Sequence, residues 1–138
     1  MTKLILASHG NLSKGMLNSV KMIVGNMADD VESFSVYPGE NPNDYATELR
    51  ERIRKNQDQQ FIIACDIKGG SVYNAILQTC VYDNVELLSG MNMNMILELV
   101  LAINNQNMNI QQIIADAKKG IELENKETLK VDIEEEDF

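Results

Sequence analysis

The chain has 138 residues, 44% of them hydrophobic, which predicts a single domain over residues 1–138 with an ordinary apolar core. Its formal net charge of −9 argues against nucleic acid and anionic membrane surfaces as direct partners, because Lys and Arg side chains drive both kinds of binding. Part of the negative charge lies at about residues 134–138, which we expect to form a solvated acidic tail.

The sequence also bears on the location of the protein. The N-terminus shows no basic segment followed by a long apolar run, so we expect no signal peptide. No stretch approaches the roughly 18 consecutive apolar residues of a membrane span. Cys65 and Cys80 lack metal-site spacing and are expected to be reduced thiols in the core. These features predict a cytoplasmic protein, and we expect it to hold no metal and no cofactor.

Hydrophobic patterning predicts alternating strands and helices. Short apolar segments predict four strands, at residues 3–8, 32–36, 61–65 and 85–88. Apolar residues at helical spacing predict five helices: one at 13–27, one that starts near residue 43, and three at 72–82, 95–104 and 110–119. Ser13 is the expected N-cap of the first helix. Residues 128–133 alternate Leu129, Val131 and Ile133 with polar residues, which predicts a final edge strand with one solvated face.

This order of elements predicts the fold class. Strands that alternate with helices form a mainly parallel sheet with right-handed crossovers and helices on both faces. The strands at 3–8 and 61–65 are apolar throughout, which is typical of strands buried on both faces. The length and the first four units favour an α/β, flavodoxin-like doubly wound sheet. We find no internal repeat and no domain boundary.

His9, the only histidine, directly follows the first predicted strand. A single histidine is more often structural or merely exposed than catalytic. Its position favours a functional role, because open α/β sheets bind ligands at the carboxyl ends of their strands. Neutral imidazole is a nitrogen nucleophile, but it needs a partner that fixes its tautomer and a group that binds what it attacks.

Asp66 follows the third predicted strand and is the candidate partner. In the flavodoxin-like order 2-1-3-4-5, strands one and three are neighbours at the topological switch point. We therefore expect His9 and Asp66 to share one rim, where the carboxylate would accept a hydrogen bond from one ring nitrogen and leave the other free. The alternative is that Asp66 is only a turn or helix-cap residue.

Gly69, Gly70 and Ser71 lead into the third predicted helix and are candidate phosphoryl-binding residues. Glycine allows close approach of the backbone, and N–H groups at a helix start, with the Ser71 hydroxyl, can bind an anion. Gly10, before the first helix, is a further candidate. The alternative is an ordinary turn with a serine cap, and the P-loop pattern is absent.

A nitrogen nucleophile, an orienting carboxylate and an anion-binding turn together predict a histidine that carries a phosphoryl group. The chain resembles the enzyme IIA domain of the mannose family of the bacterial phosphoenolpyruvate-dependent sugar phosphotransferase system (PTS). The resemblance covers nearly the whole length. It rests on LILASHG at residues 4–10, DIKGGSVYN at 66–74 and GMNMNM at 90–95.

The resemblance implies a cytoplasmic phosphotransferase in which His9 accepts a phosphoryl group from the phosphocarrier HPr and passes it to an enzyme IIB. Enzyme IIB, here expected to be a separate chain, phosphorylates a sugar that enters through a membrane permease, so membrane contact is only indirect. The resemblance further implies that Asp66 orients His9 and that Ser71 and the backbone around Gly70 bind the phosphoryl oxygens. It also implies a homodimer that exchanges its C-terminal edge strand.

Two residues depart from the family pattern. Family members more often have an uncharged residue at the position of Lys68, and proline or threonine at the position of Val72. Lys68 would add positive charge beside the phosphoryl group or alter the choice of partner. Neither departure removes a residue that the mechanism needs.

Several other functions are weighed against this one. A histidine phosphatase or phosphomutase would need a second histidine and an arginine cluster, and a receiver domain phosphorylated on Asp66 would need more acidic residues for Mg²⁺. The phosphoryl donor of dihydroxyacetone kinases shares the fold and the histidine but usually lacks this Gly-Gly-Ser form. A non-catalytic regulatory binding module of the same fold is the remaining alternative, and the intact trio of His9, Asp66 and Ser71 counts against it.

Overall fold

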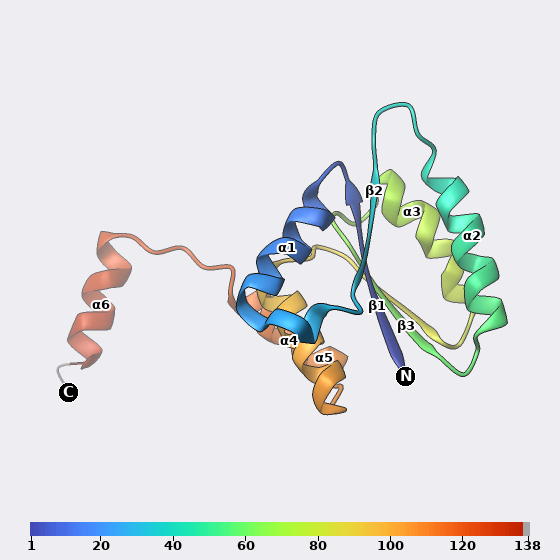
Figure 1. Cartoon of the computed structure of the whole chain (residues 1–138). Helices are drawn as coiled ribbons and strands as arrows, with labels where there is room; N and C mark the ends of the chain where they lie inside the picture. The colour runs from blue at the N-terminus through green and yellow to red at the C-terminus, as the bar shows by residue number, and fades with distance from the viewer. Residues whose placement is uncertain (137–138) are drawn as a thin grey trace.

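The computed structural model describes residues 1–136 and contains one parallel sheet of four strands (Figure 1). The sheet runs in the order β2-β1-β3-β4, and each neighbouring pair is parallel. The strands are β1 (Thr2–His9), β2 (Glu32–Val36), β3 (Gln60–Cys65) and β4 (Val85–Leu88). This order is the first four strands of the predicted doubly wound sheet, with β1 and β3 side by side.

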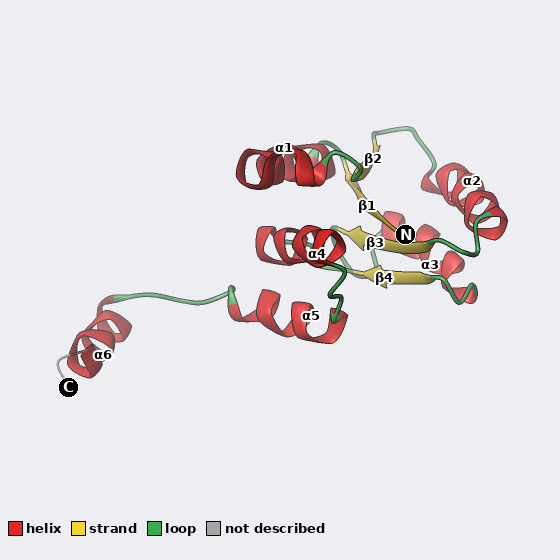
Figure 2. Ribbon diagram, turned by 60° about the horizontal axis from the view of Figure 1, so that its bottom comes forward, coloured by secondary structure: helices red, strands yellow, loops and turns green. Residues whose placement is uncertain are grey.

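Helices cover both faces of the sheet (Figure 2). Helices α1, α4 and α5 lie on one face, and α2 and α3 lie on the other. Their bounds are α1 (Leu12–Val24), α2 (Pro42–Lys55), α3 (Ser71–Leu77), α4 (Met93–Asn105), α5 (Ile110–Lys119) and α6 (Lys126–Glu136). Short 3₁₀ turns at Gly25–Ala28 and Gln78–Val81 continue α1 and α3.

The central strands are buried on both sides. In β1, Leu4 and Leu6 belong to the core beneath α1, α4 and α5, whereas Ile5 and Ala7 belong to the core beneath α2 and α3. Successive side chains of a strand point to opposite faces of the sheet. When helices cover both faces, every side chain is buried, so polar residues do not alternate with apolar ones. This explains why β1 reads as a continuous apolar run.

The prediction for the two cysteines is half correct. Cys65 is buried at the end of β3, but Cys80 is exposed. The 3₁₀ turn Gln78–Val81 winds more tightly than the α-helix predicted over these residues. The turn directs Thr79 inward, where its hydroxyl donates a hydrogen bond to the Ile76 carbonyl, and leaves Cys80 facing outward.

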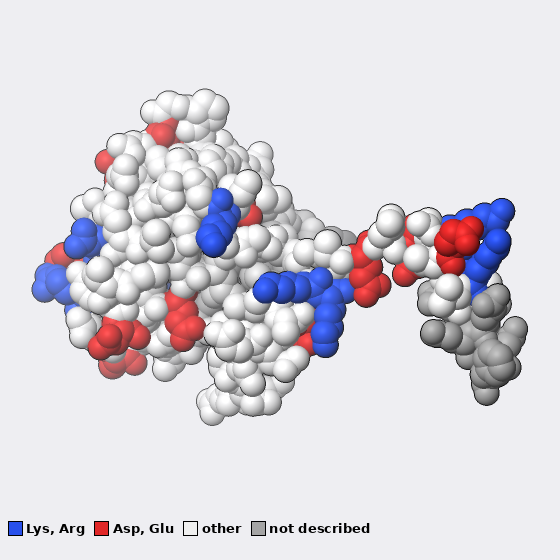
Figure 3. Space-filling view, turned by 180° about the vertical axis from the view of Figure 1, so that it is seen from behind, with Lys and Arg blue, Asp and Glu red and all other residues white. Residues whose placement is uncertain are grey.

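The predicted edge strand at residues 128–133 is wrong for this structure, because these residues lie within α6. Helix α6 stands apart from the body at the end of an extended linker (Figure 1), and in the space-filling view this segment projects as an arm that carries charges of both signs (Figure 3). Of the predicted acidic tail, residues 134–136 continue α6, and residues 137–138 lie outside the described residues.

The local sequence explains why a helix forms there. The Asn125 side chain accepts hydrogen bonds from the N–H groups of Glu127 and Thr128, which is typical of a helix start. Lys, Glu and Leu are good helix formers. A strand needs a neighbouring strand for its backbone hydrogen bonds, and this segment pairs with no strand of the described residues. No described helix is both long enough and apolar enough to cross a membrane.

Candidate active site

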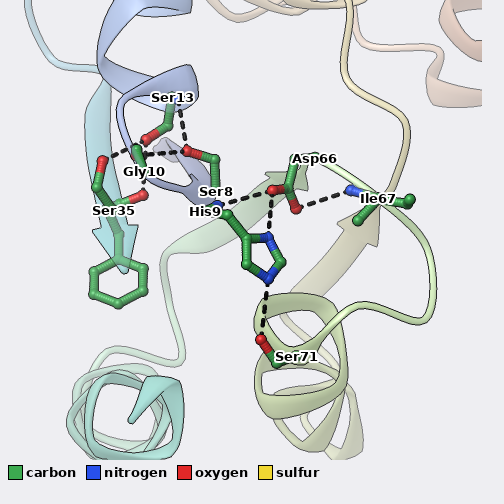
Figure 4. A network of polar contacts seen from close by, with 9 residues as sticks. Ser8, His9, Gly10, Ser13, Ser35, Asp66, Ile67 and Ser71 are labelled. Carbon is green, nitrogen blue, oxygen red and sulfur yellow. Dashed lines mark hydrogen bonds and ion pairs between the residues drawn. The ribbon is translucent and has the colours of Figure 1, made fainter. Parts of the chain in front are cut away.

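The structure brings His9 and Asp66 together at the carboxyl ends of β1 and β3. Ala7 pairs with Cys65 in the register of these strands, so the residues that follow meet on the same rim. The Asp66 Oδ2 atom accepts hydrogen bonds from the His9 backbone N–H over 2.8 Å and from His9 Nδ1 over 2.7 Å (Figure 4). The Asp66 side chain is only 8% exposed, whereas that of His9 is 49% exposed.

These contacts define the protonation pattern of the imidazole. An ionised carboxylate can only accept hydrogen bonds, so Nδ1 of His9 carries the proton that it shares with Asp66. In the neutral ring, Nε2 then holds a lone pair. That lone pair accepts a hydrogen bond from the Ser71 hydroxyl, whose Oγ lies 3.1 Å away. The ring is therefore oriented with its nucleophilic nitrogen toward the start of α3.

Hydrogen bonds also keep Asp66 ionised. Burial by itself raises the pKa of Asp66, but the bonds from the His9 backbone and ring and from the Ile67 N–H outweigh it. The last of these reaches Oδ1 over 2.8 Å, so both carboxylate oxygens have donors. The net result is a pKa below the ordinary value of 3.8.

The turn after Asp66 fits closely around the imidazole. Gly69 has a positive φ of 81°, a conformation that suits glycine, and its carbonyl accepts a hydrogen bond from the Asn74 side chain. A Cβ atom on Gly70 would lie 2.9 Å from Ile67 Cγ2 and 3.2 Å from His9 Cε1. The backbone of Gly70 therefore packs where no side chain fits, and it brings Ser71 to the ring.

Gly10 shapes the turn on the other side of His9. Its φ is 56°, and its N–H donates a hydrogen bond to the Val36 carbonyl over 2.7 Å. This N–H already has a partner at the end of β2. In this structure Gly10 therefore fixes the direction of the chain after His9 and does not offer its N–H to a ligand.

Three serine hydroxyls behind His9 form a network that the sequence did not reveal (Figure 4). The Ser8 Oγ accepts the N–H of Ser13 over 2.7 Å, and the Ser13 hydroxyl donates to the Phe34 carbonyl over 2.8 Å. The Ser35 hydroxyl lies 3.1 Å from that of Ser13. Ser13 was predicted as an N-cap, but it is buried and ties α1 to β1 and β2, while Asn11 occupies the N-cap position.

The fold and the site define a class of protein: a parallel α/β protein with a half-exposed histidine, oriented by a carboxylate, at the carboxyl ends of its strands. Comparison with known sequences agrees with this class. The family described as "PTS system fructose IIA component" (EIIA-man) matches residues 3–118. The chain is also 33% identical over 101 residues to the sorbose-specific EIIA component of the PTS of Klebsiella pneumoniae, which covers 72% of this chain and 73% of that protein.

Solved structures give the same result. The PTS IIA protein associated with the fucose utilization operon of Streptococcus pneumoniae superposes with a TM-score of 0.74 at 26% identity, covering 93% of this chain and 96% of that one. The mannose/sorbose-specific IIA subunit of Enterococcus faecalis superposes with a TM-score of 0.69 at 25% identity, covering 90% and 97%.

The chain therefore belongs to the EIIA-man family, the mannose and sorbose family of PTS enzyme IIA components. It is a phosphoryl carrier of PTS sugar uptake and a phosphotransferase system enzyme. This assignment confirms the function predicted from the sequence motifs and favours it over the dihydroxyacetone-kinase donor and the regulatory module.

Replacing Gly70 by alanine tests the close packing of the turn. We expect Gly70→Ala to displace Ile67 or the His9 ring, because the new Cβ overlaps Ile67 Cγ2, and to cost about 1–3 kcal/mol of unfolding free energy. The imidazole ¹⁵N shifts of His9 should change with it. Gly15→Ala on α1 is the control: its Cβ meets open space, so it should leave His9 unchanged and add up to about 1 kcal/mol of stability. Unaltered His9 shifts in Gly70→Ala would contradict the packing argument.

The lowered pKa of Asp66 predicts a pH-dependent contribution to stability. Because the folded pKa lies below the ordinary value of 3.8, the stabilisation is complete above that value and is lost as the pH falls through the folded pKa. The unfolding free energies of wild type and Asp66→Asn should therefore differ at neutral pH and converge in acid, as measured by urea denaturation. The exposed Asp58→Asn is the control, with a change under about 0.5 kcal/mol at neutral pH. A difference in unfolding free energy between wild type and Asp66→Asn that grows as the pH falls would contradict this prediction.

Proposed function

We propose that His9 is the residue that carries the phosphoryl group, accepting it from the phosphohistidine of HPr and passing it to an enzyme IIB. The observation that supports this is the orientation of one half-exposed ring: Nδ1 lies 2.7 Å from Asp66 Oδ2, and Nε2 lies 3.1 Å from Ser71 Oγ. A nucleophile on an open rim suits a phosphoryl group that arrives attached to another protein.

The proposed step is an exchange between two imidazoles. The lone pair of His9 Nε2 attacks the phosphorus atom, a new N–P bond forms, and the N–P bond of the donor breaks, leaving its electron pair on the donor nitrogen. The same exchange in the next encounter moves the group to enzyme IIB. Asp66 acts by holding the Nδ1 proton, which presents Nε2 unprotonated and stabilises the positive charge that the ring gains on attack.

The turn at the start of α3 is proposed to bind the phosphoryl oxygens. The Ser71 hydroxyl, which now donates to Nε2, would turn to donate to a phosphoryl oxygen once that lone pair forms the N–P bond. Gly69 and Gly70 allow the backbone to approach the group without a Cβ. Gly10 contributes through the shape of its turn, and Lys68 would add positive charge beside the group.

The proposed partners follow from this role and from the family. HPr and an enzyme IIB dock in turn over His9, and both encounters take place in the cytoplasm, with the membrane reached only through the permease complex. Residues 1–138 are proposed to form a single enzyme IIA domain. The net charge of −9 supports the absence of a nucleic-acid partner.

We also propose a homodimer in which the C-terminal segment of each chain lies along the partner. Strand β4 is at an edge of the sheet, so one row of its backbone groups is open to pairing. The segment that projects from the body exposes apolar side chains that a partner would cover: Ile121, Leu123, Leu129, Val131 and Ile133. Paired with β4 of the partner, residues 128–133 would extend, and their alternation would place the last three on one face.

Phosphorylation of the purified chain tests the role of His9. Incubated with phosphoenolpyruvate, enzyme I and HPr, the wild type should gain one acid-labile phosphoryl group by intact mass, and His9→Ala should gain none. Asp66→Asn and Ser71→Ala should slow acceptance by about 10- to 100-fold in a rapid-quench assay, because they remove the orienting carboxylate and an oxygen-binding donor. The control Asp58→Asn should match the wild type. A wild type that gains no mass while HPr is phosphorylated would overturn the proposal.

Light scattering at micromolar concentration tests the dimer. The full chain should have the mass of two 15.5 kDa subunits, and a chain ending at Gly120 should have the mass of one, because it lacks the exchanged segment. A monomeric full chain, or a truncated chain that stays dimeric, would contradict the proposed assembly.

A further inference from the structure

Asn11, Lys14 and Tyr37, together called the Lys14 cluster, lie beside His9 on the side of β1 that carries β2. His9 pairs with Val36 in the register of β1 and β2, and Tyr37 follows Val36 directly. Asn11 and Lys14 belong to the start of α1, next to the turn after His9. The groups that hold the imidazole come from the opposite side, from the end of β3 and the start of α3 (Figure 4). The cluster therefore flanks the phosphoryl site without being part of it.

Hydrogen bonds inside the cluster leave donors facing outward. The Tyr37 hydroxyl donates to Asn11 Oδ1 over 2.6 Å and accepts from Lys14 Nζ over 2.9 Å. The first bond engages the oxygen of the Asn11 side chain and turns its NH₂ group away from Tyr37. Beyond these bonds, Asn11 and Lys14 have only N–H groups to offer. Such a surface is complementary to an anion.

The position of Lys14 at the N-terminus of α1 is unfavourable for a positive charge. It lies in the first turn of α1, which contains no acidic residue, and a cation there opposes the helix dipole. Within the described residues Lys14 forms no ion pair, and the nearby carboxylate of Glu40 instead accepts the N–H of Tyr37. The ammonium lies 5.1 Å from the centroid of the Tyr37 ring. An aromatic neighbour holds this charge in place without neutralising it, so the charge stays available to a ligand.

We propose that the Lys14 cluster recognises a carboxylate on the surface of the protein that delivers the phosphoryl group to His9, an inference that rests on the proposed function. The cluster is assembled in the unphosphorylated chain, which is the form that the donor protein meets. The phosphoryl group itself must reach Nε2, which faces Ser71 on the other side of the ring. The anion that meets the cluster therefore belongs to the surface of the donor, where it sets the affinity and orientation of the encounter.

A purely structural role for the cluster makes a different prediction. The same hydrogen bonds fasten Tyr37, at the end of β2, to α1. If they did only this, loss of Lys14 would lower the unfolding free energy and leave transfer kinetics unchanged once the protein is folded. Recognition of a carboxylate instead changes KM for the donor protein and leaves kcat unchanged, because the groups that hold His9 are untouched.

Transfer kinetics from phosphorylated HPr separate these roles. We expect Lys14→Met to raise KM for phospho-HPr about fivefold at low salt with kcat unchanged, and the difference to shrink at high salt as the charges are screened. Lys14→Arg should restore most of the affinity. Tyr37→Phe, which keeps the ring but releases Asn11 and Lys14, should raise KM in the same direction. Lys21→Met, the same charge change at the far end of α1, is the control and should match the wild type.

The identity of the anion is tested from the side of HPr. Each Asp and Glu near the phosphorylated histidine of HPr is replaced by Asn or Gln and assayed with both enzymes. One HPr variant should raise the KM measured with the wild-type enzyme, but should cause no further rise in the KM measured with Lys14→Met. The proposal is overturned if Lys14→Met behaves like Lys21→Met, if kcat falls with KM unchanged, or if no HPr carboxylate couples to Lys14. Failure of the proposed function would be distinct, since the wild type itself would then accept no phosphoryl group.

Discussion

Two hydrogen bonds from His9 to one oxygen of Asp66 join the ends of β1 and β3, and the chemistry of the site depends on this contact. The two residues are 57 positions apart, so the contact exists only because the crossover through β2 and α2 returns the chain to the other side of β1. A parallel sheet places all the carboxyl ends of its strands on one rim. The buried faces of β1 and β3 hold that geometry in place.

Further contacts fix the turns on both sides of His9. Next to His9 in the sequence, Ser8 joins a network with Ser13 and Ser35 that links β1, α1 and β2 through buried or partly buried hydroxyls. No buried side-chain nitrogen or oxygen of the described residues lacks a hydrogen-bond partner. On the other side, Gly70 packs against the ring edge. A carrier does little covalent chemistry, so fixing the nucleophile is the main contribution that the protein can make.

The open position of the site fits a reaction between proteins. The His9 side chain is half exposed on the rim, and its Nε2 atom faces the Ser71 hydroxyl at the start of α3. The β2 side of the rim carries the Lys14 cluster, and the α3 side carries the turn that we propose binds the phosphoryl group. In the proposed scheme, docking and group transfer use neighbouring but separate groups, so the affinity for a partner can vary without altering the chemistry.

The sequence alone determined the elements whose signals are local or periodic. Continuous apolar runs identified β1 and β3, and the adjacency of His9 and Asp66 followed from their places at strand ends in a doubly wound sheet. The Gly69–Gly70–Ser71 turn was recognisable because its residue types are tied to backbone shape and anion binding. The family resemblance added the direction of phosphoryl transfer.

Only the tertiary structure decided features that depend on what packs against a segment. Ser13 looks like a helix cap in sequence, yet it is buried because β2 supplies partners for its hydroxyl. The N–H of Gly10 meets a carbonyl from β2, which no local pattern encodes. Residues 128–133 carry a strand pattern but form a helix, because alternation becomes a strand only where a sheet edge accepts its hydrogen bonds, and this segment lies apart from the sheet of its own chain.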